Sequence, residues 1–152
     1  MLLHTRTAHK CTVKGGTVFT FFSRTFDKFV IMRSFESALI IDDDTDLCIL
    51  LKAILKDIIP HIKFAHSIES GERLLALLHP DVIFLDNNLP DGQGVSSIKE
   101  IKSMSPGAIV VMITAAGFTR EQSLKNGADL FLEKPLSFSD IYSALKSAKA
   151  TN

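Results

Sequence analysis

The sequence lacks several features that assign other proteins to a class at once. It has no tryptophan, only two cysteines and five prolines in 152 residues, and no net charge, because 17 basic side chains balance 17 acidic ones. Two cysteines exclude a disulfide framework and a four-cysteine zinc site, and they favour a reducing compartment. No apolar run approaches the ~18–20 residues that cross a bilayer. We therefore expect a soluble, cytoplasmic protein without a membrane span.

Two phosphate-binding motifs are also absent. The turn after the first predicted strand contains neither the Gly-x-Gly-x-x-Gly of dinucleotide-binding folds nor a P-loop, which excludes the usual cradles for those nucleotides. Residues 38–152 carry 11 basic and 15 acidic side chains, so this part of the chain is mildly acidic. Because nucleic-acid binders are basic, we expect no direct nucleic-acid partner.

Residues 1–37 differ in composition from the rest of the chain. They hold six basic and two acidic side chains, a Gly15-Gly16 break and an aromatic cluster at residues 18–22, but no sustained helical or strand period. The apolar cluster is shorter than the roughly 7–15 residues that a secretory signal needs. We predict a basic N-terminal extension over residues 1–37 that adds no layer to the fold, one domain over 38–149, and a tail over 150–152.

From Ala38 onward, short apolar runs alternate with longer segments of helical period. Pro60 marks the end of the first helix, Gly127 is placed as the residue after the fourth, and Ser137 with Asp140 opens the last as a capping box. Such alternation is typical of an α/β protein with a doubly wound parallel sheet, because parallel strands need helical crossovers. The predicted strands cover residues 38–41, 62–65, 81–85, 108–113 and 130–132, and the predicted helices cover 47–58, a segment from Ser67 or Ser70 to 78, 95–101, 118–126 and 137–148.

Reactive side chains follow four of the five predicted strands. The carboxyl ends of parallel strands meet at one edge of a sheet, where ligands bind. Crowded carboxylates repel one another, and Mg²⁺, which prefers hard oxygen ligands, relieves that repulsion. Carboxylates around a metal, with one hydroxyl and one ammonium, indicate a phosphoryl-transfer site. The side chains are Asp42, Asp43 and Asp44 after the first strand, Asp86 after the third, Thr114 after the fourth and Lys134 after the fifth.

Each of these residues also has a plainer explanation when it is taken alone. Asp44 suits the N-cap of the helix that follows it. Thr114 suits a strand-end hydroxyl that bonds to the local backbone, and Lys134-Pro135 suits an ordinary loop. The occurrence of all these residues together, each at the end of a predicted strand, favours the functional interpretation.

Four motifs resemble those of the response-regulator receiver domain, and they stand in the order of that family. They are IIDDD at residues 40–44, IFLDNNLPDGQG at 83–94, VMITA at 111–115 and GADLFLEKP at 127–135. The resemblance extends from Ala38 to about Lys149. It implies a flavodoxin-like (βα)5 fold with strand order 2-1-3-4-5.

The resemblance also assigns roles in metal binding and phosphorylation. It makes Asp86 the phosphoryl acceptor. It implies that Asp42 and Asp43 hold Mg²⁺, together with Asp86 and the backbone carbonyl of Asn88.

Further roles follow on the last two strands. By resemblance, Thr114 binds one phosphoryl oxygen and Lys134 pairs with another. Phe131 takes the place of the switch aromatic, with the ring but without the hydroxyl of the tyrosine that many members carry. The family also implies a cis peptide bond between Lys134 and Pro135.

Receiver domains act in signalling, and we expect no enzyme here beyond Mg²⁺-dependent self-phosphorylation and self-dephosphorylation. The resemblance implies that a sensor histidine kinase or a histidine phosphotransfer protein supplies the phosphoryl group. Phosphorylation then changes the surface formed by the fourth helix, the fifth strand and the fifth helix, which a downstream protein reads. Because the chain ends just after the fifth predicted helix, we expect a stand-alone receiver.

Two alternatives remain open. A haloacid-dehalogenase-like phosphatase would use Asp42 as its nucleophile, although its signature Asp-x-Asp-x-Thr/Val would place Thr or Val where Asp46 stands. A binding module of the same fold that is never phosphorylated is the other alternative, but such a module has no need of every acidic and basic site residue.

Overall fold

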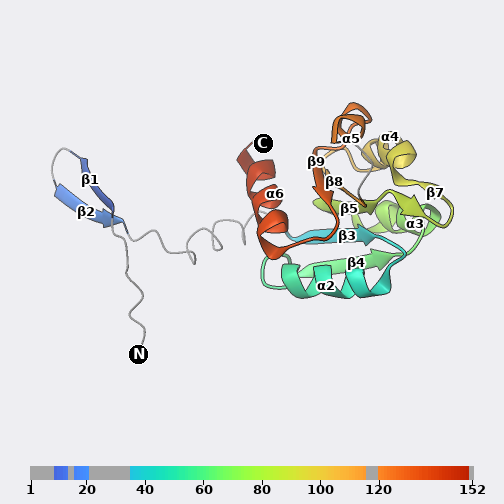
Figure 1. Ribbon diagram of the computed structural model, residues 1–152, viewed down its shortest axis with the longest axis horizontal. Coiled ribbons are helices and arrows are strands. Elements are labelled where there is room, and N and C mark those ends of the chain that lie inside the picture. Colours follow the sequence, from blue (N-terminus) through green and yellow to red (C-terminus); the bar gives the residue numbers. More distant parts are fainter. Residues whose placement is uncertain (1–8, 14–15, 21–34, 116–119, 151–152) are drawn as a thin grey trace.

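The computed structural model describes residues 9–13, 16–20, 35–115 and 120–150. Its main unit is a parallel five-stranded sheet with helices on both faces, as predicted (Figure 1). The sheet order is β4-β3-β5-β8-β9, which is the order 2-1-3-4-5 when these strands are counted along the chain. The strands are β3 Ser37–Ile41, β4 His61–Ala65, β5 Val82–Asp86, β8 Ile109–Thr114 and β9 Leu130–Glu133.

The helices lie between these strands in the sequence. α2 and α6 pack with one core cluster, which contains Cys48 and Leu145, and α3 and α4 pack with the other, which contains Leu75 and Ile98. Every residue of β5 and β8 is buried, because helices cover both faces of the sheet. The helices are α2 Thr45–Leu55, α3 Ile68–Leu78, α4 Gly94–Met104, α5 Arg120–Lys125 and α6 Phe138–Ala150.

Three predicted helix boundaries are confirmed by their local bonds. Ser67 caps α3 through the backbone N–H of Ser70. Ser137 and Asp140 bond reciprocally at the start of α6, each backbone N–H donating to the other side chain at 3.2 Å. Gly127 has φ +103°, a left-handed conformation that favours glycine.

The first helix ends earlier than predicted, at Leu55 instead of residue 58. The backbone N–H of Ile58 donates to the Leu55 carbonyl in a turn, and Ile58 and Ile59 are buried in the core. The apolar period therefore continues past the last helical residue, and for this reason the sequence pattern overestimates the length of the helix. The fourth helix is described from Arg120 onward, and residues 118 and 119 of its predicted range lie outside the described residues.

The packed unit begins before Ala38. Phe35 is 5% exposed and lies in the core cluster with α2 and α6. The backbone N–H groups of Glu36 and Ser37 donate to Asp81 Oδ2 at 2.7 and 2.9 Å. A single aromatic residue ahead of a strand shows no period, so the sequence pattern does not reveal that Phe35 belongs to the core.

The extension contains an antiparallel hairpin where we predicted no sustained period. Strand β1, His9–Val13, pairs with β2, Gly16–Thr20, so Gly16 is the first residue of β2, and Gly15 lies outside the described residues. Backbone groups make this pairing, and side-chain periodicity does not report on them. The rest of the extension, including Met32, lies outside the described residues. No helix in the part of the chain that the structure describes is long and apolar enough to cross a membrane.

Candidate functional site

Three carboxylates meet at the carboxyl edge of the sheet. Asp86 is the last residue of β5, and Asp42 and Asp43 directly follow β3, the strand beside it. One carboxyl oxygen from each of the three lies within 4.8 Å of the others. Asp42 and Asp86 are 1% and 3% exposed, whereas Asp43 is exposed. The structure thus brings together the acidic group that the sequence predicts.

Lys134 places an ammonium group between the two buried carboxylates. Its Nζ lies 2.9 Å from Asp42 Oδ2 and 2.7 Å from Asp86 Oδ1. The residue follows β9, and its backbone N–H donates to the Thr114 carbonyl at 2.8 Å, which fixes the start of the side chain beside the end of β8. One cation therefore pairs with two carboxylates that come from distant parts of the sequence.

Burial and hydrogen bonding act in opposite directions on these groups. Burial raises the pKa of Asp42, although bonds from the Asp44 N–H and from Lys134 partly oppose the rise. Burial disfavours the Lys134 ammonium, but its bonds to Asp86 and Asp42 outweigh burial, so the pKa of Lys134 is raised. The lysine is therefore charged at neutral pH.

Backbone groups fix the second oxygen of each buried carboxylate. The Asp44 N–H donates to Asp42 Oδ1 at 2.9 Å, and the Asn88 N–H donates to Asp86 Oδ2 at 2.6 Å. Each carboxylate is thus held by a backbone N–H on one oxygen and by Lys134 on the other. Bonds of this kind to a charged acceptor are strong, and they fix the orientation of both groups.

Asp44 and Thr114 have the plainer roles in this structure. Asp44 Oδ1 accepts from the N–H groups of Asp46 and Leu47, so Asp44 is the N-cap of α2 and is not one of the three clustered acids. Thr114 is 2% exposed and its hydroxyl donates to the Ala115 carbonyl at 3.3 Å. The β5–β8 register pairs Asp86 with Ile113, so Thr114 follows one residue beyond that pair.

A small hairpin follows Asp86 where the sequence shows only turn-forming residues. Its strands are β6, Asn88–Leu89, and β7, Gly92–Gln93. The base of the hairpin is tight, because a Cβ on Gly94 would lie 2.0 Å from the Asp86 carbonyl oxygen, so position 94 requires glycine. Asn87 Oδ1 accepts from the Val95 N–H at 3.2 Å near the start of α4.

The structure also shows a site neighbour that sequence reasoning missed. His66 Nδ1 lies 2.9 Å from the Asp42 carbonyl oxygen, and because that oxygen can only accept, Nδ1 is the donor. His66 directly follows β4, so its place at the end of a predicted strand was the signal that could have found it.

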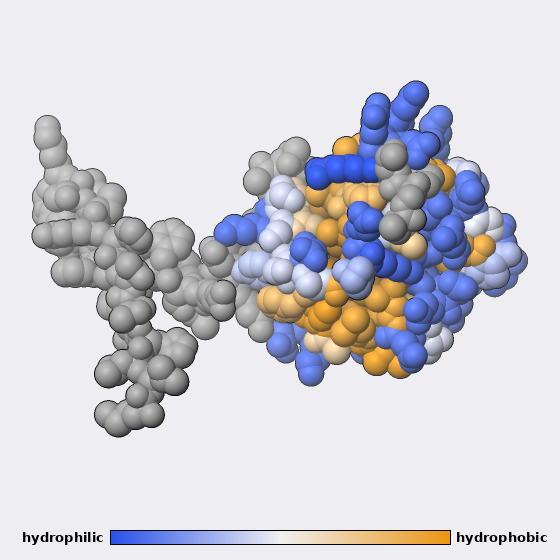
Figure 2. Space-filling model, in the orientation of Figure 1, coloured by the Kyte–Doolittle hydropathy of each residue, from blue (hydrophilic) through white to orange (hydrophobic). Residues whose placement is uncertain are grey.

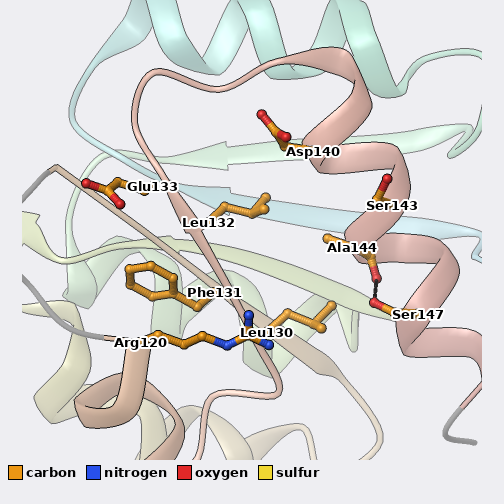
Figure 3. A pocket seen from close by; sticks show the side chains of 9 residues that line it. All are labelled: Arg120, Leu130, Phe131, Leu132, Glu133, Asp140, Ser143, Ala144 and Ser147. Atoms are coloured by element: carbon orange, nitrogen blue, oxygen red, sulfur yellow. Dashed lines mark hydrogen bonds between the residues drawn. The ribbon is translucent and has the colours of Figure 1, made fainter.

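The predicted switch aromatic lies on a different surface from the acids. Phe131 lines a cavity of about 490 Å³ between α5, β9 and α6. Figure 3 shows Leu130 and Leu132 pointing toward α6, while Phe131 and Glu133 point the other way from the same strand. All four residues of β9 line the cavity, and Lys134 directly follows them. The bond between Lys134 and Pro135 is a cis peptide bond, as the resemblance implied.

The acidic cluster has the donor set for a divalent cation. Three carboxylates supply hard oxygen atoms within a few ångströms of one another, two of them already oriented by backbone bonds. Mg²⁺ binds such oxygens and keeps several waters, so it needs only a few protein ligands, and the exposed Asp43 leaves one side open to water. These residues fit Mg²⁺.

Comparisons with known proteins agree with this geometry. Residues 38–146 match a family described as the response regulator receiver domain. The response regulator protein PilR of Pseudomonas aeruginosa is 37% identical over 103 residues, which are 66% of this chain and 23% of PilR. The chain thus matches less than a quarter of the length of that relative.

Two solved structures are similar in fold. The beryllofluoride-activated NtrC4 receiver domain dimer has a TM-score of 0.67 and 32% identity, over 76% of this chain and 97% of that one. A response regulator of Burkholderia pseudomallei with a phosphorylated aspartic acid, a calcium ion and citrate has a TM-score of 0.65 and 25% identity, over 76% and 71% of the two chains.

Proposed function

Because this chain belongs to the response regulator receiver domain family, we propose that it accepts a phosphoryl group on Asp86 from a sensor histidine kinase or a histidine phosphotransfer protein. One observation carries the proposal: the buried Asp86 carboxylate is held by the Asn88 N–H and by Lys134, beside Asp42 and Asp43. The phosphorylated aspartic acid in the Burkholderia structure supports the same kind of reaction.

The chain's own residues account for the chemistry. An Asp86 carboxylate oxygen attacks phosphorus, a P–O bond forms as the P–N bond to the donor histidine breaks, and the histidine keeps the electron pair. Lys134 moves from neutralising two carboxylates to pairing with a phosphoryl oxygen, and the Thr114 hydroxyl donates to another. Asp42, Asp43, Asp86 and the Asn88 carbonyl would hold Mg²⁺, which when bound would supply positive charge that favours phosphoryl transfer. Water later hydrolyses the aspartyl phosphate.

Two surfaces suit the partners of this reaction. An apolar patch covers part of α2, where Ile49 and Leu50 are 57% and 47% exposed (Figure 2). Because α2 begins three residues after Asp42, this patch offers the phosphodonor protein an apolar contact near the reaction. On the output side, the α5–β9–α6 surface with Phe131 is the part that a downstream protein reads.

The buried free thiol of Cys48 supports a cytoplasmic location.

The proposal is tested by labelling with acetyl phosphate and Mg²⁺, followed by intact-mass and peptide mapping. The wild-type chain should gain one phosphoryl group on the peptide that contains Asp86, and Asp86→Asn should gain none. Asp44→Asn is the matched control, because asparagine also caps helices and Asp44 lies outside the acidic cluster, and it should label like wild type.

Asp42→Asn separates the phosphatase alternative from the proposal. If Asp86→Asn labels normally while Asp42→Asn does not, Asp42 is the nucleophile and the proposal is wrong. A chain that binds Mg²⁺ but never labels would instead favour the binding module of the same fold.

A further inference from the structure

Asp91 joins the loop after the phosphorylation site to a neighbouring helix. It lies between β6 and β7, and its two carboxyl oxygens accept from the N–H groups of Ile68 and Glu69, each at 2.9 Å. The first N–H groups of a helix have no partner within it. The Ser67 hydroxyl accepts from the third of these groups, the N–H of Ser70. Asp91, which lies outside α3, accepts from the other two N–H groups of the first turn. These two bonds hold the pKa of Asp91 below its usual range.

The hairpin that carries Asp91 is held on one side by Leu89, which is buried in the core cluster with α3 and α4, while Asp91 at its tip is exposed. Each strand has two residues, and isolated hairpins are marginally stable in water. At its base, the Gly94 N–H donates to the Asn87 carbonyl at 2.8 Å. At its tip, Asp91 bonds to α3, and a Cβ on Gly92 would lie only 3.2 Å from Ile68 Cδ1. The Asp91 bonds and this close approach therefore fix the tip against α3.

Asn88 connects this anchored hairpin to the reacting carboxylate. Asn88 pairs with Gln93 across the hairpin, and its N–H donates to Asp86 Oδ2 at 2.6 Å. A shift of the hairpin would move that N–H and let the Asp86 carboxylate turn. It would also move the Asn88 carbonyl, which the proposed function assigns to the cation.

We propose that Asp91 is a positioning residue: by anchoring the hairpin to α3, it holds Asn88 against Asp86 and so sets the orientation of the phosphoryl acceptor and the affinity for Mg²⁺. The inference rests on the proposed function for the roles of Asp86 and Asn88. On this inference the start of α3 helps to hold Asn88 and Asp86 in place, although α3 contributes no side chain to the acidic cluster.

The experiment uses the full chain with Asp91→Asn and Asp91→Ala. Asparagine keeps one acceptor oxygen and alanine keeps none, so the effects should be graded. Glu69→Gln is the matched control, because it removes one negative charge at the turn of α3 that Asp91 caps. It leaves the Glu69 backbone N–H in place, and the side-chain partner that the structure gives for Glu69 is Arg73. The two readouts are the chemical shift of the Asn88 amide without metal and the dissociation constant for Mg²⁺ by titration calorimetry.

In Asp91→Ala the Asn88 amide signal should move upfield as its bond to Asp86 lengthens. Mg²⁺ should bind about tenfold more weakly, the size of effect usual when an outer-shell partner of a metal site is removed. Glu69→Gln should match wild type in both readouts. An unchanged Asn88 amide shift and an unchanged Mg²⁺ affinity in Asp91→Ala would overturn the inference, even if the variant unfolds more easily. That result would mean that Asp91 only caps α3 and does not position Asn88.

Failure of the proposed function would look different. If wild type gains no phosphoryl group on Asp86, the proposed function is wrong, whereas the Asn88 amide shift in the Asp91 variants still shows whether Asp91 positions that N–H.

Discussion

Lys134 forms ion pairs with two buried carboxylates, and its removal leaves them beside each other without a cation. Removing one partner of a buried ion pair costs ~3–5 kcal/mol, and since Lys134 is partly exposed we expect Lys134→Met to lower the free energy of unfolding by about 2 kcal/mol without Mg²⁺. Urea unfolding measures the change. Lys99→Met, at an exposed position of α4, is the control and should have almost no effect.

Lys134→Met should lower the free energy of unfolding but strengthen the binding of Mg²⁺. Without the ammonium, Asp42 and Asp86 attract a divalent cation more strongly. We expect Mg²⁺ to bind about fivefold more tightly, roughly 1 kcal/mol, the interaction of unit charges a few ångströms apart in water. Phosphorylation should nevertheless slow, because no lysine meets the phosphoryl oxygen. Weaker Mg²⁺ binding in Lys134→Met would contradict this assignment of the lysine.

Cys48 shows how a neutral residue near the site responds to the acids. Burial, together with the nearby carboxylates of Asp42 and Asp44, raises the pKa of its thiol to about 11. Thiolates react and thiols do not, so iodoacetamide should leave Cys48 unmodified in the folded protein at pH 8 and modify it in urea. Peptide-resolved mass spectrometry measures the difference, and equal modification in both conditions would contradict it.

The raised pKa of the Cys48 thiol also sets how the stability of the folded protein changes with pH. The folded state holds the Cys48 proton more tightly than the unfolded chain, whose thiol has a pKa of about 9.0. The stabilisation from this thiol is therefore complete below pH 9 and is lost as the pH rises from about 9 toward 11.

At the scale of elements, α5, β9 and α6 should respond to phosphorylation through Thr114 and Phe131. The Thr114 hydroxyl donates to the Ala115 carbonyl in this structure. On the proposed function it turns toward the phosphoryl group, and we expect the Phe131 ring to fill the space that it leaves. Thr114→Ala should therefore still accept a phosphoryl group on Asp86 but lose much of the change on this surface. NMR shifts of its amides before and after addition of beryllofluoride measure the response.

Ser143→Ala is the control for this switch, because it also removes one hydroxyl and Ser143, on α6, lines the cavity that Phe131 lines. It should respond like wild type. An identical response in wild type and Thr114→Ala would refute the coupling between Thr114 and Phe131.

The parts of this fold that the sequence predicts are those set by periodicity over a whole element. The five strands and the meeting of Asp42, Asp86 and Lys134 follow from apolar runs and from the geometry of parallel sheets. The hairpin over residues 88–93 could not be predicted in this way, because two-residue strands show no alternation. Likewise, the bonds from Asp91 to α3 join groups more than 20 residues apart, and no local pattern reports them.

At the scale of the whole molecule, the start of the packed unit can be tested by truncation. A chain that begins at Met32 keeps Phe35 and should unfold cooperatively with wild-type labelling of Asp86. A chain that begins at Ala38 loses Phe35 and the two backbone bonds to Asp81, so its free energy of unfolding should fall by about 3–5 kcal/mol.

Phe35→Ala in the full chain separates the two causes. If the aromatic ring is the main contribution, this variant should approach the stability of the Ala38 truncation, as measured by urea unfolding. Loss of folding in the Met32 truncation would instead show that residues before 32 belong to the core.

The ion pair of Lys134 with Asp42 joins residues 92 positions apart, and this spacing orders events during synthesis. Chains are made from the N-terminus, so Asp42 and Asp86 leave the ribosome well before Lys134. Strand β9 and helix α6, which complete the sheet and one core cluster, are made after the other strands of the sheet. A nascent chain that stops after β8 therefore carries the acids without their cation, and dissolved Mg²⁺ is the ion that can stand in for the lysine until Lys134 has been added.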